Sequence, residues 1–395
     1  MVLPVLTNSS TLPLPPSKGL MMTRPLKLAI AGIGNCASAL VQGIHFYGHD
    51  IPEGGHGHGL MSWDIGGVVP GDIEVVAAFD VTADKVGRRL GSAIHAVPNA
   101  TLNFAPVPED YGPKVLRGPL DDGIGIYLDD VVSISHYEPV DVAQTLRDTD
   151  ADVLVAYLPV GSERDQKAYA QAALDAGVAF VNAIPVFIAS DPVWAQKFHD
   201  AGVPIIGDDI KSQVGATILH RSVARLFEAR GLTIDEMYQL NVGGNTDFLN
   251  MLERGRLESK KISKTQAVTG NLQYDFNPRN VHVGPSDHVP HLGDRKHAIM
   301  QIVASGFGGA TTRLNMQLEV WDSPNSAGVI IDAVRVAHFA RQHGVGGPLD
   351  AASAFFMKSP PHQLEDFLAL DELRDFLTYT PQRSNPHIPQ EESNV

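Results

Sequence analysis

Three things are scarce in this sequence of 395 residues: cysteine, positive charge and long apolar runs. The single cysteine, Cys36, excludes a disulfide framework within the chain and favours a cytoplasmic protein. Lysine and arginine total 30 against 45 acidic residues, and the net charge of −15 argues against nucleic acid or an anionic membrane as the main partner. No run of about 18 apolar residues is present, so we expect no transmembrane helix.

The remaining composition is that of an ordinary globular protein. Hydrophobic residues make up 44% of the chain, and its length is sufficient for two domains. The two ends differ from the rest. Residues 1–24 are rich in proline, serine and threonine, lack the pattern of a signal peptide and are expected to be disordered, as is the tail at 381–395.

Strands alternate with helices over the first half of the sequence. Short apolar runs predict buried strands at 26–31, 73–80, 152–159, 179–185 and 203–209. Helical patterns lie between them, at 37–45, 82–94, 139–148, 162–177 and after 191. This alternation predicts an α/β fold of the Rossmann type, in which helices cover both faces of a doubly wound parallel sheet.

The pattern changes after about residue 232. Longer segments, several with alternating apolar and polar residues, predict a mixed or antiparallel sheet with strands at 236–244, 266–276, 296–307 and 312–321. Amphipathic helices follow at 325–343 and 362–378. We therefore expect a discontinuous dinucleotide-binding domain at 25–212 and 323–380, and a second α+β domain at 213–322.

The segment AGIGNCAS, which follows the first expected strand, is typical of a dinucleotide-binding turn. Gly32 permits the tight turn, and Gly34 allows the backbone to approach a pyrophosphate at the start of the next helix. The third glycine position is Ala37 or Ser38, a departure from the motif. Asp80 ends the next strand, where a carboxylate accepts ribose hydroxyls and repels a 2′-phosphate, so NAD is favoured over NADP. The alternative is a glycine turn without a ligand.

A lysine cluster lies in the segment LESKKISKTQ at 257–266. Lys260 and Lys264 are four residues apart and would share one face of a helix, whereas Lys261 would point elsewhere. Such a cluster can form an anion site or a solvated helix face, and the spacing alone does not decide between them.

Two histidines suggest a metal site but do not define one. His56 and His58 lie in a glycine-rich loop at 48–72, and the sequence offers no further ligands nearby. We therefore assign no metal ligand from the sequence.

Six strings are more specific together than any one of them. They are GDDIKSQVGAT (207–217), NVGGNTDFLNM (241–251), ESKKISKT (258–265), GDRKHA (293–298), EVWDSPNSAG (319–328) and FFMKSP (355–360). With these strings in this order, the chain resembles myo-inositol-1-phosphate synthases (inositol-3-phosphate synthases), especially the shorter actinobacterial form, from about residue 26 to 361.

The resemblance implies an isomerase that converts D-glucose 6-phosphate to 1D-myo-inositol 3-phosphate, the first step of inositol biosynthesis. NAD oxidises C5, the resulting ketone allows enolisation at C6, C6 attacks the C1 aldehyde to close the ring, and the ketone is reduced again. The resemblance also implies a homotetramer with subunit contacts in the second domain, and it leaves a divalent cation near the cofactor phosphates open.

The resemblance implies six catalytic residues: Lys260, Lys264, Lys296, Lys358, Asp294 and Asp322. Lys260 and Lys296 are expected at the C5 oxygen and in proton transfer, Lys264 near the phosphate or C1, and Lys358 near the oxyanions at C5 and C1. The two aspartates are expected to hold lysines charged.

The expected cofactor site combines the glycine turn with later polar residues. Its members are Gly32, Gly34, Asn35, Cys36, Asp80, Tyr169, Asp209, Ser212, Asn245 and Asp247. Cys36 is expected to be a small residue at a helix start and not a nucleophile. Two other functions fit the same pattern: a dehydrogenase with net redox change, and a nucleotide-binding regulator without catalysis.

Overall fold

The computed structural model describes residues 24–49, 57–253, 255 and 277–378. The lysine cluster at 257–266, the expected strand at 266–276 and His56 lie outside the described residues, as do 1–23 and 379–395. Arg24, the last residue of the extension expected to be disordered, is among the described residues. Its guanidinium lies 3.0 Å from a carboxylate oxygen of Asp150 and 3.3 Å from one of Asp152.

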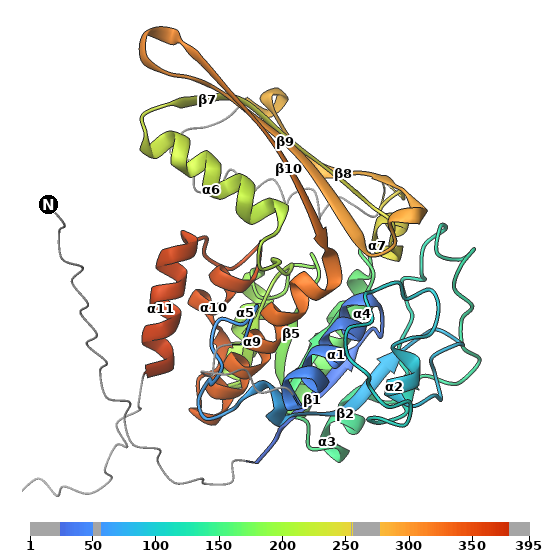
Figure 1. Cartoon of the computed structure of the whole chain (residues 1–395). Helices are drawn as coiled ribbons and strands as arrows, with labels where there is room; N and C mark the ends of the chain where they lie inside the picture. Colours follow the sequence, from blue (N-terminus) through green and yellow to red (C-terminus); the bar gives the residue numbers. More distant parts are fainter. Residues whose placement is uncertain (1–23, 50–56, 254, 256–276, 379–395) are drawn as a thin grey trace, which may run out of the picture.

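In the described residues, seven parallel strands form the first sheet. In spatial order they are β11 (Gly347–Pro348), β6 (Pro204–Ile206), β5 (Ala179–Asn182), β4 (Val153–Ala156), β1 (Leu26–Ala31), β2 (Ile73–Asp80) and β3 (Val115–Arg117). Strands β1, β2 and β5 lie in the lower part of the molecule in Figure 1. The chain runs outward from β1 in one direction and from β4 in the other. The predicted doubly wound parallel sheet is therefore confirmed, with its switch point between β1 and β4.

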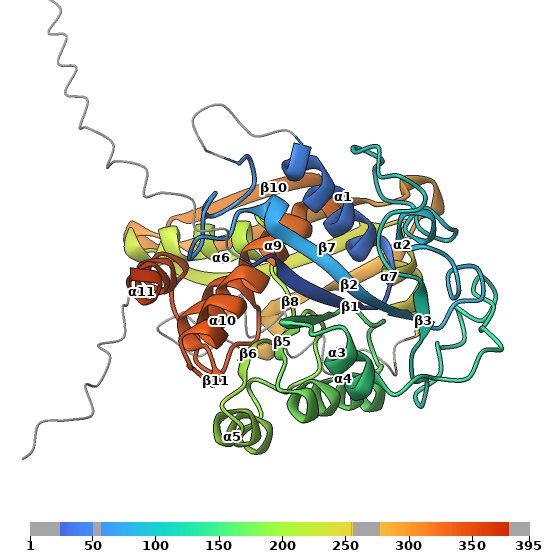
Figure 2. The same ribbon diagram turned by 90° about the horizontal axis from the view of Figure 1, so that it is seen from below.

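Helices cover both faces of this sheet because its central strands are apolar on both sides. Along β1, Leu28 and Ile30 face one core, whereas Ala29 and Ala31 face the other. Figure 2 shows the two helix layers on opposite sides of the strands. The first layer contains α1 (Asn35–His49), α9 (Asp322–Gln342), α10 (Asp350–Phe356) and α11 (Asp366–Thr378), and the second α3 (Val142–Asp148), α4 (Glu163–Ala176) and α5 (Pro192–Asp200).

The second sheet has four strands and is mixed. Their order is β10 (Thr311–Trp321), β9 (Arg295–Ser305), β7 (Thr233–Gly243) and β8 (Val281–His288), with β9 antiparallel to both neighbours and β8 parallel to β7. Helix α6 (Ala216–Ala229) packs on one face through a core that includes Ala224, Ile234 and Ile302. The short helix α7 (Thr246–Asn250) follows β7. The predicted mixed sheet is confirmed.

The helix expected at 82–94 is mostly absent. Only α2 (Leu90–Ala93) is helical, and residues 83–87 form turns. Gly87 has a φ of 87°, which an α-helix does not contain. Four 3₁₀ turns complete the described structure: η2 (Pro70–Asp72), η4 (Pro278–Asn280), η5 (Pro290–Leu292) and η6 (Phe307–Gly309).

The chain passes between the sheets at the two positions expected as domain boundaries. Strand β6 and helix α6 flank residue 212, and β10 leads directly into α9, which packs on the first sheet. This supports the division at 212 and 323, which stays a prediction. Among the residues that the structure describes, no helix combines the length and the apolar character needed to cross a membrane.

Candidate active site

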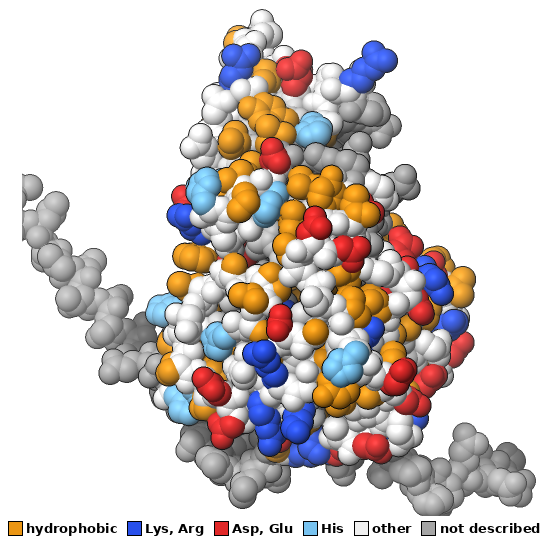
Figure 3. Space-filling model, turned by 90° about the vertical axis from the view of Figure 1, so that its right-hand side faces the viewer, with side chains coloured by type: hydrophobic (Ala, Val, Ile, Leu, Met, Phe, Trp, Pro, Cys, Tyr) orange, Lys and Arg blue, Asp and Glu red, His pale blue; other side chains and the backbone are white. Residues whose placement is uncertain are grey.

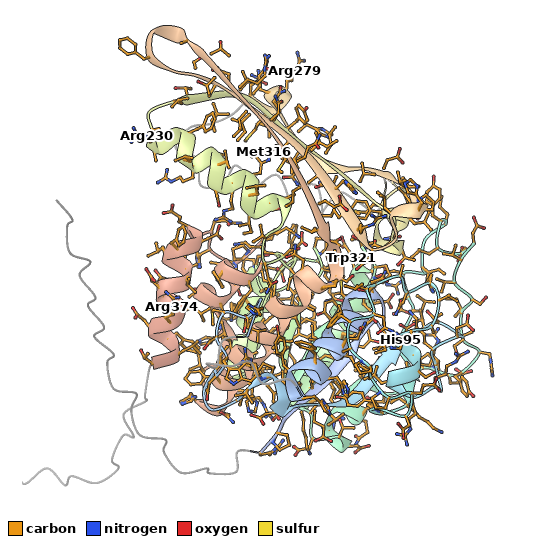
Figure 4. All side chains as sticks on the ribbon, viewed as in Figure 1. His95, Arg230, Arg279, Met316, Trp321 and Arg374 are labelled. Atoms are coloured by element: carbon orange, nitrogen blue, oxygen red, sulfur yellow. The ribbon has the colours of Figure 1, made fainter. Side chains whose placement is uncertain are left out.

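A cavity of about 280 Å³ is lined by residues from both sheets. It lies at the carboxyl ends of the parallel strands, where ligands bind in such sheets. Figure 4 labels Trp321, the last residue of β10, at the junction of the two sheets, and Asp322 follows it in the cavity wall. The predicted site residues that line the cavity are Gly32, Gly34, Asn35, Cys36, Asp80, Tyr169, Asp209, Ser212, Asn245, Asp247, Lys296, Asp322 and Lys358. Lys260 and Lys264 lie outside the described residues.

The two glycines of the turn after β1 are needed for different reasons. Gly32 has a φ of 86°, and a Cβ there would lie 2.7 Å from the carbonyl oxygen of Tyr157. The fold itself therefore requires glycine at this position. A Cβ on Gly34 would meet no protein atom within 4 Å. Since Gly34 lines the cavity, its missing side chain leaves the backbone open to the close approach of a phosphate.

Asp80 holds this turn in place. One carboxylate oxygen accepts a hydrogen bond from Ile33 N at 2.8 Å, and the other accepts from Val81 N at 2.7 Å and Thr82 N at 2.8 Å. The predicted position of Asp80 at the end of β2 is correct, but most of its acceptor capacity serves the backbone. Its structural contribution is therefore to fix the geometry of the glycine turn.

Lys85 fixes the next peptide of the turn, on the carbonyl side of Ile33. Its ammonium donates to Ile33 O at 2.8 Å and to Asn99 Oδ1 at 3.1 Å, and lies 3.9 Å from Asp80. Burial lowers the pKa of Lys85, and the charge of Asp80 opposes this shift. Lys85 and Asn99 also line the cavity and were not predicted as site residues from the sequence. A lysine five residues after a strand-end acid was the available signal, and no comparable signal marks Asn99.

Lys296 and Asp322 form an ion pair in the cavity wall. The ammonium of Lys296, near the start of β9, lies 2.5 Å from Asp322 Oδ1, at the start of α9. Burial by itself would lower the pKa of Lys296, but the carboxylates of Asp322 and Asp247 outweigh it, so the pKa is raised. Asp322 therefore holds Lys296 as a cation, and the catalytic role expected of both residues stays a prediction.

Asp294 has neutral hydrogen-bond partners in the described part of the chain. Its carboxylate makes no ion pair with a lysine in the described part of the chain, and it lies behind the cavity wall. It accepts hydrogen bonds from Thr101 Oγ1 at 3.0 Å, Asn245 Nδ2 at 3.0 Å and Ser323 Oγ at 2.8 Å. Burial raises the pKa of Asp294. Neutral donors satisfy this carboxylate, which therefore joins three segments around the cavity, and its expected role in holding a lysine charged stays a prediction.

Asn245 caps α7. Its side-chain oxygen accepts from Asp247 N at 3.0 Å and Phe248 N at 3.3 Å, while its amide nitrogen donates to Asp294. The cap orients the start of α7 so that Asp247 lines the cavity.

Lys358 and Asp209 form a second ion pair. The ammonium lies 2.8 Å from Asp209 Oδ1 and also donates to Ile210 O at 2.5 Å. Asp209 adopts a left-handed conformation with a φ of 63°, which is uncommon for a residue other than glycine. The Lys358 side chain is only 15% exposed, so it is not a surface lysine that extends into solvent. Nearby Lys211 points away from the cavity and pairs with Asp366 at 2.9 Å.

The start of α6 adds backbone donors to the wall. Its first residues line the cavity next to Ser212, and Gly215 at the N-cap provides no side-chain cap. Since the first N–H groups of a helix lack intrahelical partners and carry partial positive charge, this end suits an anion.

Tyr169 and Tyr157 border the cavity more deeply. Tyr169 lines the cavity and packs against Phe79 with ring centroids 5.9 Å apart. The hydroxyl of Tyr157 is buried and has no hydrogen-bond partner in the described part of the chain. The sequence analysis missed Tyr157, because nothing in its neighbouring residues indicates a buried hydroxyl.

The chain is similar to known proteins in its sequence and in its fold. A sequence model described as Myo-inositol-1-phosphate synthase matches residues 215–323. Inositol-3-phosphate synthase of Mycolicibacterium smegmatis is 59% identical over 356 residues, which cover 89% of this chain and 98% of that protein. The enzyme of the same name from Corynebacterium glutamicum is 57% identical over 362 residues. The matched region covers 90% of this chain and 99% of that protein.

The chain belongs to the inositol-3-phosphate synthase family. The resemblance based on the six strings is thereby confirmed. A crystal structure of inositol-3-phosphate synthase from Caenorhabditis elegans superposes with a TM-score of 0.69 at 16% identity, covering 90% of this chain and 85% of that one. At this identity the likeness shows a shared fold alone.

Metal ligands can be assigned only among the described residues. In the described ranges, no group of three or more histidine, cysteine, aspartate or glutamate residues is arranged to hold a metal ion. His58 belongs to that part of the chain, but His56 does not.

Cys36 can be tested directly. Burial, together with the charges of Asp322 and Asp294, raises the pKa of its thiol to about 12, so almost no thiolate exists at neutral pH. We expect Cys36→Ser to keep turnover within about threefold of the parent protein, because a protonated thiol is a poor nucleophile. Steady-state assays of both proteins will measure this. A loss of two orders of magnitude or more would assign Cys36 to the chemistry.

Proposed function

We propose that this protein is an inositol-3-phosphate synthase: it converts D-glucose 6-phosphate to 1D-myo-inositol 3-phosphate and uses NAD without net consumption. The observation that carries the proposal is the placement of two lysine–aspartate pairs, Lys296–Asp322 and Lys358–Asp209, in the wall of the cavity that also contains the glycine turn. The family to which the chain belongs supports the same reaction.

The residues around the glycine turn fit NAD. Gly34 leaves the backbone accessible, α1 begins directly after it, and Asp80 lies at the end of the neighbouring strand. When bound, NAD supplies the oxidising and reducing equivalents at C5 of the sugar. The chain's contribution is to hold Ile33 between Asp80 and Lys85, so that the turn has one conformation before binding.

The two lysines suit the negative charge that develops during the reaction. Charge appears on the C5 oxygen in the enolate and on the C1 oxygen during ring closure. A fixed cation near such an oxygen contributes roughly 3–4 kcal/mol if it acts like an oxyanion-hole donor. Lys296 is held protonated, so we assign it to electrostatic stabilisation of the C5 oxygen, while the proton that leaves the C5 hydroxyl on oxidation and returns on reduction passes through another group. Acceptance of the C6 proton then belongs to another group, for which Lys260 stays the proposal.

The substrate phosphate is proposed to bind at the start of α6. Ser212 and the free N–H groups of the first helical turn offer donors there, and the helix dipole favours an anion. Lys264, expected near the phosphate or C1, is proposed to add charge at this end.

The second sheet supports a homotetramer. Helix α6 covers one face of this sheet, and Ile299 and Trp321 are each 40% exposed on the other. Figure 3 shows hydrophobic side chains on this upper part of the molecule. Sedimentation velocity on the purified protein will test the proposal, and a monomer at micromolar concentration would contradict it.

The activity can be tested with purified protein, glucose 6-phosphate and a catalytic amount of NAD⁺. We expect inositol phosphate in many-fold excess over NAD⁺ without accumulation of NADH. NADH formed in step with product would instead indicate a dehydrogenase. NAD binding without turnover, with and without added Mg²⁺ or Zn²⁺, would favour a nucleotide-binding regulator. Repeating the assay after exhaustive chelation tests the dependence on a divalent cation.

A further inference from the structure

A buried row of polar side chains runs from α6 to the wall of the cavity. His220 on α6 and Gln239 and Asn241 on β7 are at most 1% exposed. His220 Nδ1 and Gln239 Oε1 are 3.2 Å apart, Gln239 Nε2 donates to Asn241 Oδ1 at 3.2 Å, and Asn241 Nδ2 donates to Gly284 O at 2.9 Å. Gln239 and Asn241 line the cavity, whereas His220 lies behind them.

The hydrogen bonds in this row can run in only one direction. Gly284 O is a carbonyl and can only accept, so the amide nitrogen of Asn241 must face it. Asn241 Oδ1 then faces Gln239, whose amide nitrogen donates to it, and Gln239 Oε1 is left to face the imidazole. His220 must therefore carry its hydrogen on Nδ1. A neutral ring fits this arrangement, since burial lowers the pKa of His220 to about 4.

Gln239 and Asn241 each keep one amide hydrogen that the hydrogen bonds of this row do not use. Each amide nitrogen has two hydrogens, and each uses one of them within the row. The second hydrogens of Gln239 and Asn241 make no other hydrogen bond to the described residues. They belong to the same cavity wall as Ser212 and the first turn of α6.

We propose that His220 is a positioning residue that keeps the amide of Gln239 turned with its N–H group, beside that of Asn241, toward an oxygen of the phosphorylated substrate. If the Gln239 amide flipped, its carbonyl oxygen would face the cavity beside Asn241. This oxygen would repel the oxygen of the bound substrate. His220 Nδ1–H and Asn241 Oδ1 oppose the flip together, because the flipped amide would set a nitrogen donor against the imidazole hydrogen and an oxygen against Asn241 Oδ1. This inference rests on the proposed function and adds a group that governs substrate affinity from outside the cavity.

The test compares His220→Leu with His220→Asn. Leucine removes the donor to Gln239, whereas the amide nitrogen of asparagine can donate from nearly the position of Nδ1. We expect His220→Leu to raise the KM for glucose 6-phosphate roughly 10- to 100-fold, the effect of losing a hydrogen bond to a charged group, with a smaller change in kcat. His220→Asn should restore the KM to within about threefold, since one neutral donor replaces another.

A second measurement does not depend on turnover. Inorganic phosphate should raise the Tm of the NAD-loaded parent protein and of His220→Asn, and raise that of His220→Leu much less. His338→Leu is the matched control, since it removes a buried imidazole from α9 that does not line the cavity. If this control weakens phosphate stabilisation equally, the effect of His220 is general and the inference is wrong.

The outcomes separate this inference from the proposed function. A parent protein that forms no inositol phosphate would refute the proposed function, and the phosphate-dependent Tm would still test His220. A parent-like KM and Tm shift in His220→Leu would refute the inference alone. If His220→Leu does not fold, Gln239→Leu provides the same test, because it removes one cavity donor and frees Asn241. Parent-like KM in that variant would equally refute the inference.

Discussion

Lys296→Met is expected to lower kcat by about 100- to 1,000-fold, because it removes a fixed cation from the place where charge develops. Methionine has nearly the length of the lysine side chain, so packing against β10 should be kept. Single-turnover assays with glucose 6-phosphate, together with NAD titration by fluorescence, will measure chemistry and cofactor binding separately. NAD affinity should change little.

The matched control is Lys114→Met, which removes an exposed lysine that does not line the cavity. It should leave kcat unchanged. If Lys296→Met turned over like this control, the ion pair with Asp322 would be structural and the electrostatic assignment would fail.

The partner carboxylate provides an independent check through pH. In the parent protein, Asp322 and Asp247 raise the pKa of Lys296 against the effect of burial. Asp322→Asn removes the carboxylate that raises the pKa of Lys296 most, so burial should then lower this pKa. The ammonium form is lost as pH rises through that pKa, and the alkaline limb of the kcat profile should therefore move to lower pH. An alkaline limb unchanged by Asp322→Asn would show that another group sets it.

The parts of this protein that the sequence predicts best are those that depend on local pattern. The glycine turn and the acid at the end of the next strand follow from residues close to their own strands. Short apolar runs likewise identify the central strands of the first sheet. The helix predicted at 82–94 does not form over most of that segment, because Gly87 adopts a left-handed backbone conformation. Strands β3 and β11 have three and two residues, too few for any period to be visible.

The parts that the sequence does not predict depend on contacts between distant segments. Asp294 was expected to tune a lysine because both residue types occur in one motif. In the fold, its carboxylate instead meets Thr101 and Ser323, which no spacing rule connects to it. Lys85 and His220 escaped notice for the same reason, since each acts on a residue of another element. Resemblance identified the cavity lysines, and only the structure gives their partners.

Asp80→Ala is expected to destabilise the protein by about 3–5 kcal/mol, because it leaves buried donors unsatisfied and a buried lysine without its neighbouring charge. Ile33 N, Val81 N and Thr82 N would lose their common acceptor. Urea unfolding of both proteins, followed by circular dichroism, will measure the free energy of unfolding. Lys85→Met should act in the same direction, since Ile33 O would lose its donor.

The same variant separates two accounts of cofactor choice. If Asp80 mainly excludes a 2′-phosphate, Asp80→Ala should gain NADP binding while the fold stays stable. If Asp80 mainly holds the turn, affinity for NAD and NADP should fall together, since both place a pyrophosphate on the same backbone. The three backbone N–H bonds favour the second result. Titration of both cofactors at a temperature where the variant is folded will distinguish the two accounts. A stable variant that prefers NADP would show that the Asp80 carboxylate acts mainly on the ribose and not on the glycine turn.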